Sequence, residues 1–410
     1  MQVLLSHPLA EPDFPTEKGA VPAIPTYIVL RDRQRLTGPF RGIREPGLES
    51  LAFAPPEPVI EVEDVDPKGR AELLRDPEVL TVTPKMPIRL IEPLAEEDAS
   101  SDEVWGIAAV GADKSQFSGV DTVVAVLDTG IDSSHPAFAG VELVEEDFSG
   151  SGAGDRQGHG THCAGTIFGR DVEGKRIGIA RGVSRALIGK VLNDDGGGGS
   201  EMLFRGIRWA VEQDANVISM SLGFDFPGLV QQLTDGGWPA DLAASSALEA
   251  YRGNLRMFDA LMGVVRAEQE FGAGTVVVAA AGNESRRDVD PRYEIAASLP
   301  AAAEGVVSVG AVAQTMQIAP FSNTFPRICG PGVGIESAKA GGGTRLLSGT
   351  SMACPHVAGV AAMWWEQIRG AGLPARADTV VAKVLASART DVFGPDVDPT
   401  DRGVGLVAAP

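Results

Sequence analysis

The sequence predicts an α/β protein: a three-layer domain with a mostly parallel central sheet, preceded by a small α+β domain. From Trp105 onward, near-continuous apolar runs alternate with helical segments. Runs that are apolar on both faces are typical of parallel strands buried on both sides. Before Trp105 the chain is instead rich in proline and acidic residues and carries only short strand candidates. We therefore expect an N-terminal unit over 1–103 and a main domain over 104–410.

The N-terminal unit shows alternating strand patterns and one helical pattern. The expected strands are "TYIVL" (26–30), "VIEVE" (59–63) and "VLTVTP" (79–84), and the expected helix is "GRAELLR" (69–75). The acidic stretch "EPLAEEDASSDE" (92–103) then predicts an exposed linker, where cleavage sites concentrate.

The main domain's strand candidates are "TVVAVLD" (122–128), "RALIGKVL" (185–192), "ANVISMSLG" (215–223), "GTVVVAAAGN" (274–283) and "VVSVGAV" (306–312). Helices are expected around 160–168, 200–213, 245–270, 351–370 and 377–388. The segment "DDGGGGS" (194–200) is interpreted as a flexible loop. Strands that alternate with helices in this way indicate a parallel sheet.

Composition excludes several classes of protein. The formal net charge of −20 argues against nucleic acid as a partner, and no apolar run reaches the length of a membrane span. Three widely spaced cysteines argue against a disulfide framework. Since no Lys or Arg precedes the first short apolar stretch, no secretory signal is recognised. We expect a cytoplasmic protein, with secretion as the alternative.

Four polar groups lie where strands end or helices begin. Asp128 and Asn283 each end an apolar run, His159 opens "GHGTHCAGT" (158–166), and Ser351 lies in "SGTSMACPHVAG" (348–359). Pro355 is expected in the first turn of the helix that follows. In open α/β sheets, sites form at the carboxyl ends of the strands. An acid, a base, an amide donor and a serine are the groups that acyl transfer requires.

At these residues the sequence resembles the subtilisin-like serine proteases, the subtilases. The matching segments are "DTGID" (128–132), "GHGTHCAGT", "SMSLG" (219–223), "AAAGNE" (279–284) and "GTSMACPHVAG" (349–359), in the family's order. The resemblance covers roughly residues 104 to 410. It implies a serine endopeptidase with Asp128 as the triad acid, His159 as the base, Ser351 as the nucleophile and Asn283 as the oxyanion donor. It also implies structural roles for His162 and His135.

The same resemblance implies a substrate cleft for protein or peptide chains. Its expected residues are Ser221, Leu222 and Gly223 on one segment, Ala280, Ala281 and Gly282 on the other, and Ser298 at the floor of the primary pocket. Because the residues of this pocket are small and uncharged, we expect a preference for apolar P1 residues. The segment 224–271 is longer than the family predicts. It either covers non-primed subsites or forms a surface helix.

The family further implies an inhibitory propeptide, and we expect residues 1–103 to fill that role as an intramolecular partner. Self-cleavage should then produce a new N-terminus between about residues 93 and 105. No cofactor is required for the chemistry. A structural calcium ion in the loop 168–178, near Asp171 and Glu173, remains possible, but one short acidic loop does not supply six oxygen ligands. No metal position is predicted.

Three other functions compete with this interpretation. A zinc module would use His162, Cys163, Cys354 and His356, but adjacent His-Cys spacing is unusual for such sites. An inactive binding protein is disfavoured because all four chemical residues are present. An aspartic protease needs two carboxylates in one site, and the chain has one "DTG".

Overall fold

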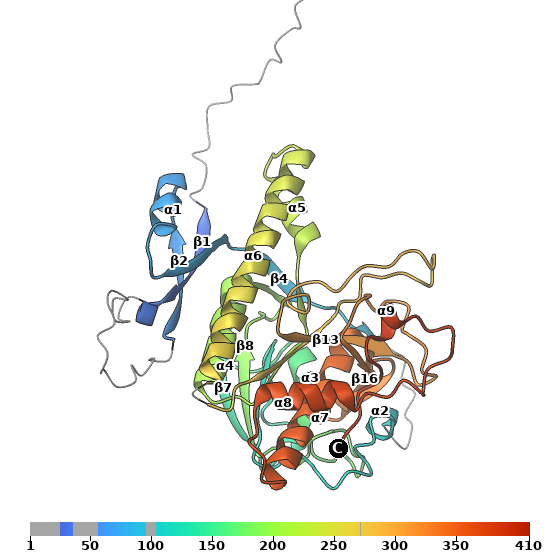
Figure 1. Cartoon of the computed structure of the whole chain (residues 1–410). Helices are drawn as coiled ribbons and strands as arrows, with labels where there is room; N and C mark the ends of the chain where they lie inside the picture. Colours follow the sequence, from blue (N-terminus) through green and yellow to red (C-terminus); the bar gives the residue numbers. More distant parts are fainter. Residues whose placement is uncertain (1–24, 36–55, 96–103, 271) are drawn as a thin grey trace, which may run out of the picture.

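The computed structural model describes residues 25–35, 56–95, 104–270 and 272–410 (Figure 1). Its centre is a seven-stranded sheet in which every neighbouring pair is parallel. Across the sheet the order is β14 (Ile328–Pro331), β13 (Val306–Val312), β12 (Val276–Ala280), β10 (Val217–Met220), β6 (Val123–Asp128), β8 (Arg185–Lys190) and β7 (Glu142–Asp147). The apolar runs of the sequence form five of these strands. The predicted fold class is confirmed.

Helices cover both faces of the sheet because successive residues of a strand point to opposite sides. Val124 and Val126 of β6 pack into one core with α3 (His159–Phe168), α7 (Thr350–Gly370) and α8 (Ala377–Ala386). Ala125 and Leu127 pack into the other, with α4 (Ser200–Glu212) and α6 (Ala240–Glu268). The short helices α2 (Trp105–Ala109) and α9 (Pro399–Arg402) lie outside these layers (Figure 1).

The N-terminal unit is a small α+β domain, as predicted. β1 (Thr26–Asp32) lies between β2 (Pro58–Asp64) and β3 (Val79–Pro84), antiparallel to both, and α1 (Pro67–Leu73) follows β2. Ile28 and Leu30 belong to the same core as α4 and α6. Figure 1 shows α6 running beside this small sheet, and Asn254 of α6 donates to Pro84 O at 3.0 Å. The small sheet is therefore packed onto the helical layer of the main domain.

The structure differs from two expectations about loops. The stretch 92–103, predicted as an exposed linker, contains β5 (Leu94–Ala95), although Leu94 is exposed as expected. β5 pairs with β16 (Thr344–Ser348), and β16 pairs in turn with β15 (Ile335–Ala338). Residues 96–103 of that linker lie outside the described residues. The glycine run 194–200, expected as a flexible loop, contains β9 (Gly197–Gly199). It is ordered because its backbone pairs with β4 (Pro87–Leu90).

β4 is the element that links the N-terminal unit to the site. It lies between β9 and β11 (Leu222–Phe224) and is antiparallel to both. The inserted segment continues from β11 into α5 (Phe226–Asp235) and α6. α6 buries Met257, Phe258 and Leu261 in the main core, so the insertion is more than a surface helix. None of the helices in the described ranges is long and apolar enough to cross a membrane.

Candidate active site

An acid and a histidine meet at the carboxyl edge of the sheet. Asp128 is the last residue of β6, and His159 is the first residue of α3. Asp128 Oδ1 lies 2.8 Å from His159 Nδ1 and accepts a second hydrogen bond from the Thr129 N–H, also at 2.8 Å. Both side chains are buried. This contact orients the imidazole so that Nε2 is the nitrogen left for chemistry.

The loop before His159 is held by a buried acid that the sequence analysis did not single out. Asp155 accepts hydrogen bonds from Thr129 Oγ1 at 2.9 Å, from the Gly158 N–H at 2.6 Å, and from both the N–H and the hydroxyl of Thr161. The signal for it is an aspartate four residues before the histidine in a glycine-rich turn. Asp155 is thus a positioning residue for His159.

Close backbone contact also places His159. A Cβ on Gly160 would lie 2.2 Å from Gly130 O, which no side chain tolerates. The start of α3 can therefore approach the turn after Asp128 only because residue 160 is glycine.

Ser351 is the second residue of α7 and is fully buried. Pro355 stands inside the helix, beyond its first turn, so the predicted position was wrong. Because proline has no N–H, the carbonyl of Ser351 has no helical partner. It accepts instead from Ser221 Oγ at 3.0 Å and from Cys163 Sγ at 3.5 Å. The carbonyl that proline leaves free thus links the turn at Ser351 to the "SLG" segment through the Ser221 hydroxyl.

The Ser351 hydroxyl and the Asn283 amide converge on one point. A Cβ on Gly349 would lie 2.8 Å from Ser351 Oγ and 2.9 Å from Asn283 Nδ2. Asn283 Oδ1 accepts from the N–H and the hydroxyl of Thr350, both at 2.9 Å, which leaves Nδ2 directed outward. Ser351 Oγ itself lies 3.4 Å from Met352 Sδ, and in the described ranges no hydrogen bond joins it to His159. Catalytic hydrogen bonds are often long before substrate is in place.

A second buried residue that the sequence analysis missed holds the loop after β12. Asn323 donates to Ala281 O at 3.1 Å and accepts from the N–H groups of Glu284 and Ser285, both at 3.1 Å. These hydrogen bonds fix the backbone on both sides of Asn283. Only a buried amide in "FSNTF" (321–325) marks it in the sequence, which is a weak signal.

The predicted substrate segments line a cleft that the chain's own residues occupy. Leu222 aligns with Leu90 and Gly223 with Arg89, while Gly198 of the opposite wall aligns with Ile88. Just beyond β4, Asn283 Nδ2 donates to Glu92 O at 3.1 Å.

The pocket residues gather around Ile91. A Cβ on Gly223 would lie 3.5 Å from Ile91 Cγ1 and 3.7 Å from Ser298 Oγ. Ala281 accepts from the Ser298 N–H at 3.2 Å, and the Gly282 N–H donates to Thr350 Oγ1 at 3.1 Å. Ala280 ends β12 just before them. The structure therefore brings the predicted substrate residues together, with the Ser221 hydroxyl directed to the serine turn.

The two histidines with expected structural roles, His162 and His135, form hydrogen bonds with backbone carbonyls. His162 Nε2 lies 3.0 Å from Ile335 O and 3.2 Å from Arg345 O, and burial lowers the pKa of His162 to about 3. His135 Nε2 lies 2.8 Å from Gly343 O. Both positions fit the structural roles that the resemblance implies.

The zinc alternative does not fit the structure. His356 Nδ1 lies 2.8 Å from Met352 O, and burial lowers the pKa of His356 to about 4. Cys354 Sγ contacts Ser219 Oγ at 3.5 Å, and burial raises the pKa of its thiol to about 11. Within the described residues, the group of potential metal ligands that lies together is Asp128, His159 and Cys163, where the acid–histidine contact already accounts for two.

The loop considered for calcium carries its own cations. Asp171 accepts from Arg181 Nη1 at 2.9 Å. The Arg176 guanidinium donates to three backbone carbonyls, those of Ala112, Gly178 and Ile179, at 2.9 to 3.1 Å. A guanidinium thus already meets one carbonyl of this loop and two carbonyls beside it, and no calcium position is proposed.

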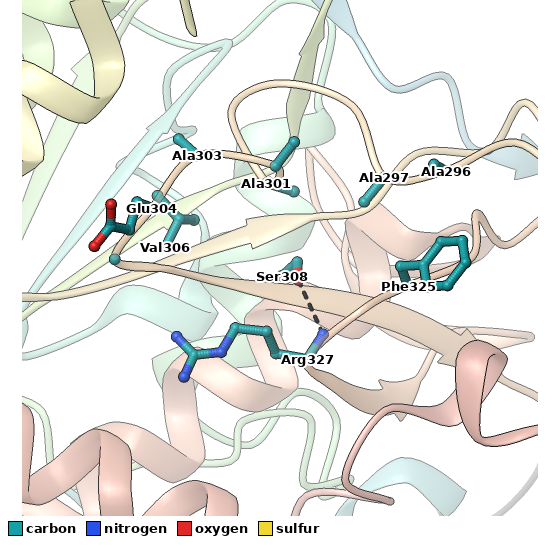
Figure 2. A pocket seen from close by; sticks show the side chains of 11 residues that line it. Ala296, Ala297, Ala301, Ala303, Glu304, Val306, Ser308, Phe325 and Arg327 are labelled. Carbon is teal, nitrogen blue, oxygen red and sulfur yellow. Dashed lines mark hydrogen bonds between the residues drawn. The ribbon is translucent and has the colours of Figure 1, made fainter. Parts of the chain in front are cut away.

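Figure 2 shows a separate surface pocket of about 410 Å³. It is lined by residues 296–297 and 301–306 together with Ser308, Phe325 and Arg327, and the Arg327 N–H donates to Ser308 Oγ at 2.9 Å. None of the predicted catalytic residues lines it. The cleft beside Ser351 is instead filled by β4 and the residues that follow.

A parallel three-layer sheet domain with a hydrogen-bonded acid–histidine pair at the carboxyl edge and a buried serine at a helix start is the arrangement expected of a serine hydrolase. Residues 119–405 match the model of the subtilase family, so the chain belongs to that family and is a serine-type endopeptidase. It is 34% identical to a thermostable alkaline protease of Halalkalibacterium halodurans over 75% of this chain and 72% of the relative. It is 36% identical to the major intracellular serine protease of Bacillus subtilis, over 63% of this chain and 73% of the relative. Against subtilisin-like protease 1 of Arthroderma gypseum the identity is 32%, over 79% of this chain and 60% of the relative.

The buried histidines predict acid sensitivity of the fold. Because His162 and His356 have folded pKa values of about 3 and 4, below the unfolded value of 6.5, the unfolded chain binds more protons between these values. Stability is then complete above about pH 6.5 and is lost as pH falls. At pH 5 each histidine should remove about 2 kcal/mol of unfolding free energy.

Denaturant unfolding of the Ser351→Ala protein between pH 7 and 5 measures this loss. Comparison with Ser351→Ala/His356→Gln isolates one histidine, because buried acids titrate equally in both proteins. In the double variant, the loss of unfolding free energy that the two histidines cause between pH 7 and 5 should be about half as large. An identical pH slope in the two proteins would contradict a neutral buried His356.

Proposed function

We propose that Ser351, His159, Asp128 and Asn283 carry out peptide-bond hydrolysis through an acyl-enzyme. The observation that carries this proposal is the convergence of Ser351 Oγ and Asn283 Nδ2 on Gly349, together with the 2.8 Å contact between Asp128 and His159. Labelling of Ser351 by a fluorophosphonate, and its loss in Ser351→Ala, tests the assignment.

Each residue has a distinct role in this mechanism. His159 Nε2 takes the proton of Ser351 Oγ as the oxygen attacks the carbonyl, and later gives it to the leaving amine. Asp128 holds the His159 tautomer and stabilises the imidazolium. Asn283 Nδ2 donates to the oxyanion that develops, assisted by backbone N–H groups at the start of α7. Water then takes the place of the amine: His159 Nε2 accepts its proton as it attacks the ester carbonyl, and returns the proton to Ser351 Oγ as the acyl C–O bond breaks.

Asn283→Ala tests the oxyanion role. The expected result is a fall in kcat of about 10²–10³ with little change in KM, the magnitude known for the corresponding amide of subtilisin. Steady-state kinetics on an apolar-P1 peptide measure it. Gln317→Ala is the matched control, since it removes an exposed amide in the loop after β13 that has no part in the site. An unchanged kcat in Asn283→Ala would remove this residue from the mechanism.

We also propose that the N-terminal unit is an inhibitory propeptide whose residues 85–95 block the cleft. β4 supplies the non-primed strand between β9 and β11, and β5 continues on the other side of Ser351 against β16. Strand addition of this kind gives affinity through main-chain hydrogen bonds. Since the segment is tethered, its effective concentration at the cleft is high and substrates must displace it.

The way the segment lies favours inhibition over rapid cleavage. Ile91 fills the space beside Gly223 and Ser298, yet Asn283 donates to the carbonyl of Glu92, one residue further along. Hydrolysis needs the oxyanion donor at the carbonyl of the pocket residue itself. Pro93 follows directly and restricts the backbone of Glu92. We infer that processing by Ser351 requires the segment to shift, with the cut falling between about residues 93 and 105.

The occupied pocket bears on specificity. An apolar side chain, Ile91, is 5% exposed among small residues, which supports an apolar P1 preference for protein and peptide substrates. The insertion contributes to the same region, because Asp225 at the start of α5 donates its N–H to Pro87 O at 2.9 Å. Shaping of the non-primed subsites by 224–271 remains a prediction.

A further inference from the structure

Each wall of the cleft ends in an acidic residue. Glu201 comes two residues after β9, at the start of α4, and Asp225 comes directly after β11. Both acids face the segment that occupies the cleft, and each contacts one of its two basic residues. Counted from Ile91, which lies in the primary pocket, Arg89 is the second residue toward the N-terminus and Lys85 is the sixth. These are called the second and sixth upstream positions.

The surroundings of Glu201 favour a cation beside its carboxylate. Its side chain is 8% exposed, Oε1 lies 2.5 Å from Lys85 Nζ, and Oε2 is buried with no hydrogen-bond partner in the described part of the chain. A carboxylate held this far from water is stable only with a cation beside it. The neighbouring backbone extends the strand pairing: the Ser200 N–H donates to Met86 O at 2.9 Å and the Met86 N–H to Ser200 Oγ at 3.0 Å. A peptide in this register therefore brings its sixth upstream side chain to Glu201.

Asp225 meets the second upstream side chain. Its Oδ1 lies 3.8 Å from Arg89 Nε and accepts from the Gly228 N–H at 2.9 Å, which fixes the carboxylate at the start of α5. Asp225 is 17% exposed and Arg89 53%, so the pair is open to solvent. An exposed ion pair contributes little, so its effect on selectivity is expected to be smaller than that of Glu201.

We propose that Glu201 and Asp225 are specificity-determining residues that select cationic side chains, Lys or Arg, at the sixth and second positions upstream of the pocket residue. The proposal rests on the endopeptidase function above. Whenever the N-terminal segment leaves the cleft, Glu201 loses its cation, and a substrate with a basic residue at the sixth position replaces it. The selected class is an extended, unfolded protein segment with an apolar residue in the pocket and basic residues upstream.

Competing peptide pairs test the proposal on the full chain. One pair carries lysine or norleucine at the sixth upstream position, and the other carries arginine or citrulline at the second. Occupation of the cleft by residues 85–95 lowers the apparent kcat/KM of both members of a pair by the same factor. The ratio within a pair is thus independent of inhibition, and the same ratios are measured in an Ile91→Ala chain, where the cleft is more open.

The unmodified chain should prefer lysine about tenfold at the sixth position and arginine about two- to fivefold at the second. Glu201→Gln should abolish the first preference alone, and Asp225→Asn, which retains a helix-capping oxygen, the second alone. Glu212→Gln, on the same helix as Glu201, should leave both ratios unchanged. Ratios near one in the unmodified chain, or ratios unaltered in the acid variants, would overturn the proposal. If no peptide is cleaved by any variant, the endopeptidase function itself fails, which is a distinguishable result.

Discussion

Ser351→Ala is expected to lower kcat by about 10⁶, the largest effect of any single substitution in this chain. The residues of a triad act as one unit, as in subtilisin, so removal of the nucleophile removes almost the whole advantage of the site. His159→Ala should have nearly the same effect, and the double variant should be no worse than either one. Steady-state rates on an apolar-P1 peptide, with active-site titration, measure these losses.

The same variant tests self-processing. The Ser351→Ala protein should retain its intact mass, whereas the unmodified protein should show a new N-terminus between about residues 93 and 105. Asp235→Asn, at the exposed end of α5, serves as a control that should process normally. If the unmodified protein stays uncut and is fully active, the N-terminal unit is an ordinary accessory domain and the propeptide role is wrong.

The parts of this structure that the sequence predicts are those with a side-chain pattern. Runs such as "TVVAVLD" are apolar on both faces, and only the interior of a parallel sheet accommodates them. The chemical residues are predicted because each stands at or just beyond the end of a strand, or at the start of a helix, within segments that resemble the family. Local chemistry and global fold agree at these positions.

The missed parts depend on backbone pairing between distant segments. Gly197–Gly199 has no side chains to reveal a strand, and it is ordered only because Pro87–Leu90 lies against it. Residues 94–95 look like linker for the same reason: their partner, β16, lies far along the sequence. Asp155 and Asn323 act through hydrogen bonds to loops whose shape is not encoded in any periodic pattern. Pro355 suggests a first helical turn, but tertiary bonds to the freed Ser351 carbonyl allow it deeper in the helix.

Weakening the blocking segment should activate the full chain. Ile91 is 5% exposed beside Gly223 and Ser298, so Ile91→Ala removes buried methyl groups that hold the segment in the primary pocket. Such a truncation costs about 2–4 kcal/mol when the side chain is buried. This free energy is lost only in the closed state, because in the open state the side chain is in water. The fraction of open molecules should therefore rise by about 30- to 1,000-fold, since each 1.4 kcal/mol is about a factor of ten.

Initial rates on a small chromogenic peptide, recorded before any change in intact mass, measure this activation. Leu94→Ala is the matched control: Leu94 lies in β5 of the same segment, but its side chain is 54% exposed, so its truncation should leave the initial rate nearly unchanged. Titration with fluorophosphonate should show Ser351 reacting faster in Ile91→Ala than in the Leu94→Ala chain, because access to the serine is what the segment controls. Equal initial rates for the unmodified chain and Ile91→Ala would mean that residues 85–95 leave the cleft freely in solution. In that case the strand pairing between β4, β9 and β11 would be too weak to inhibit the enzyme. Control of activity would then have to lie elsewhere in the chain.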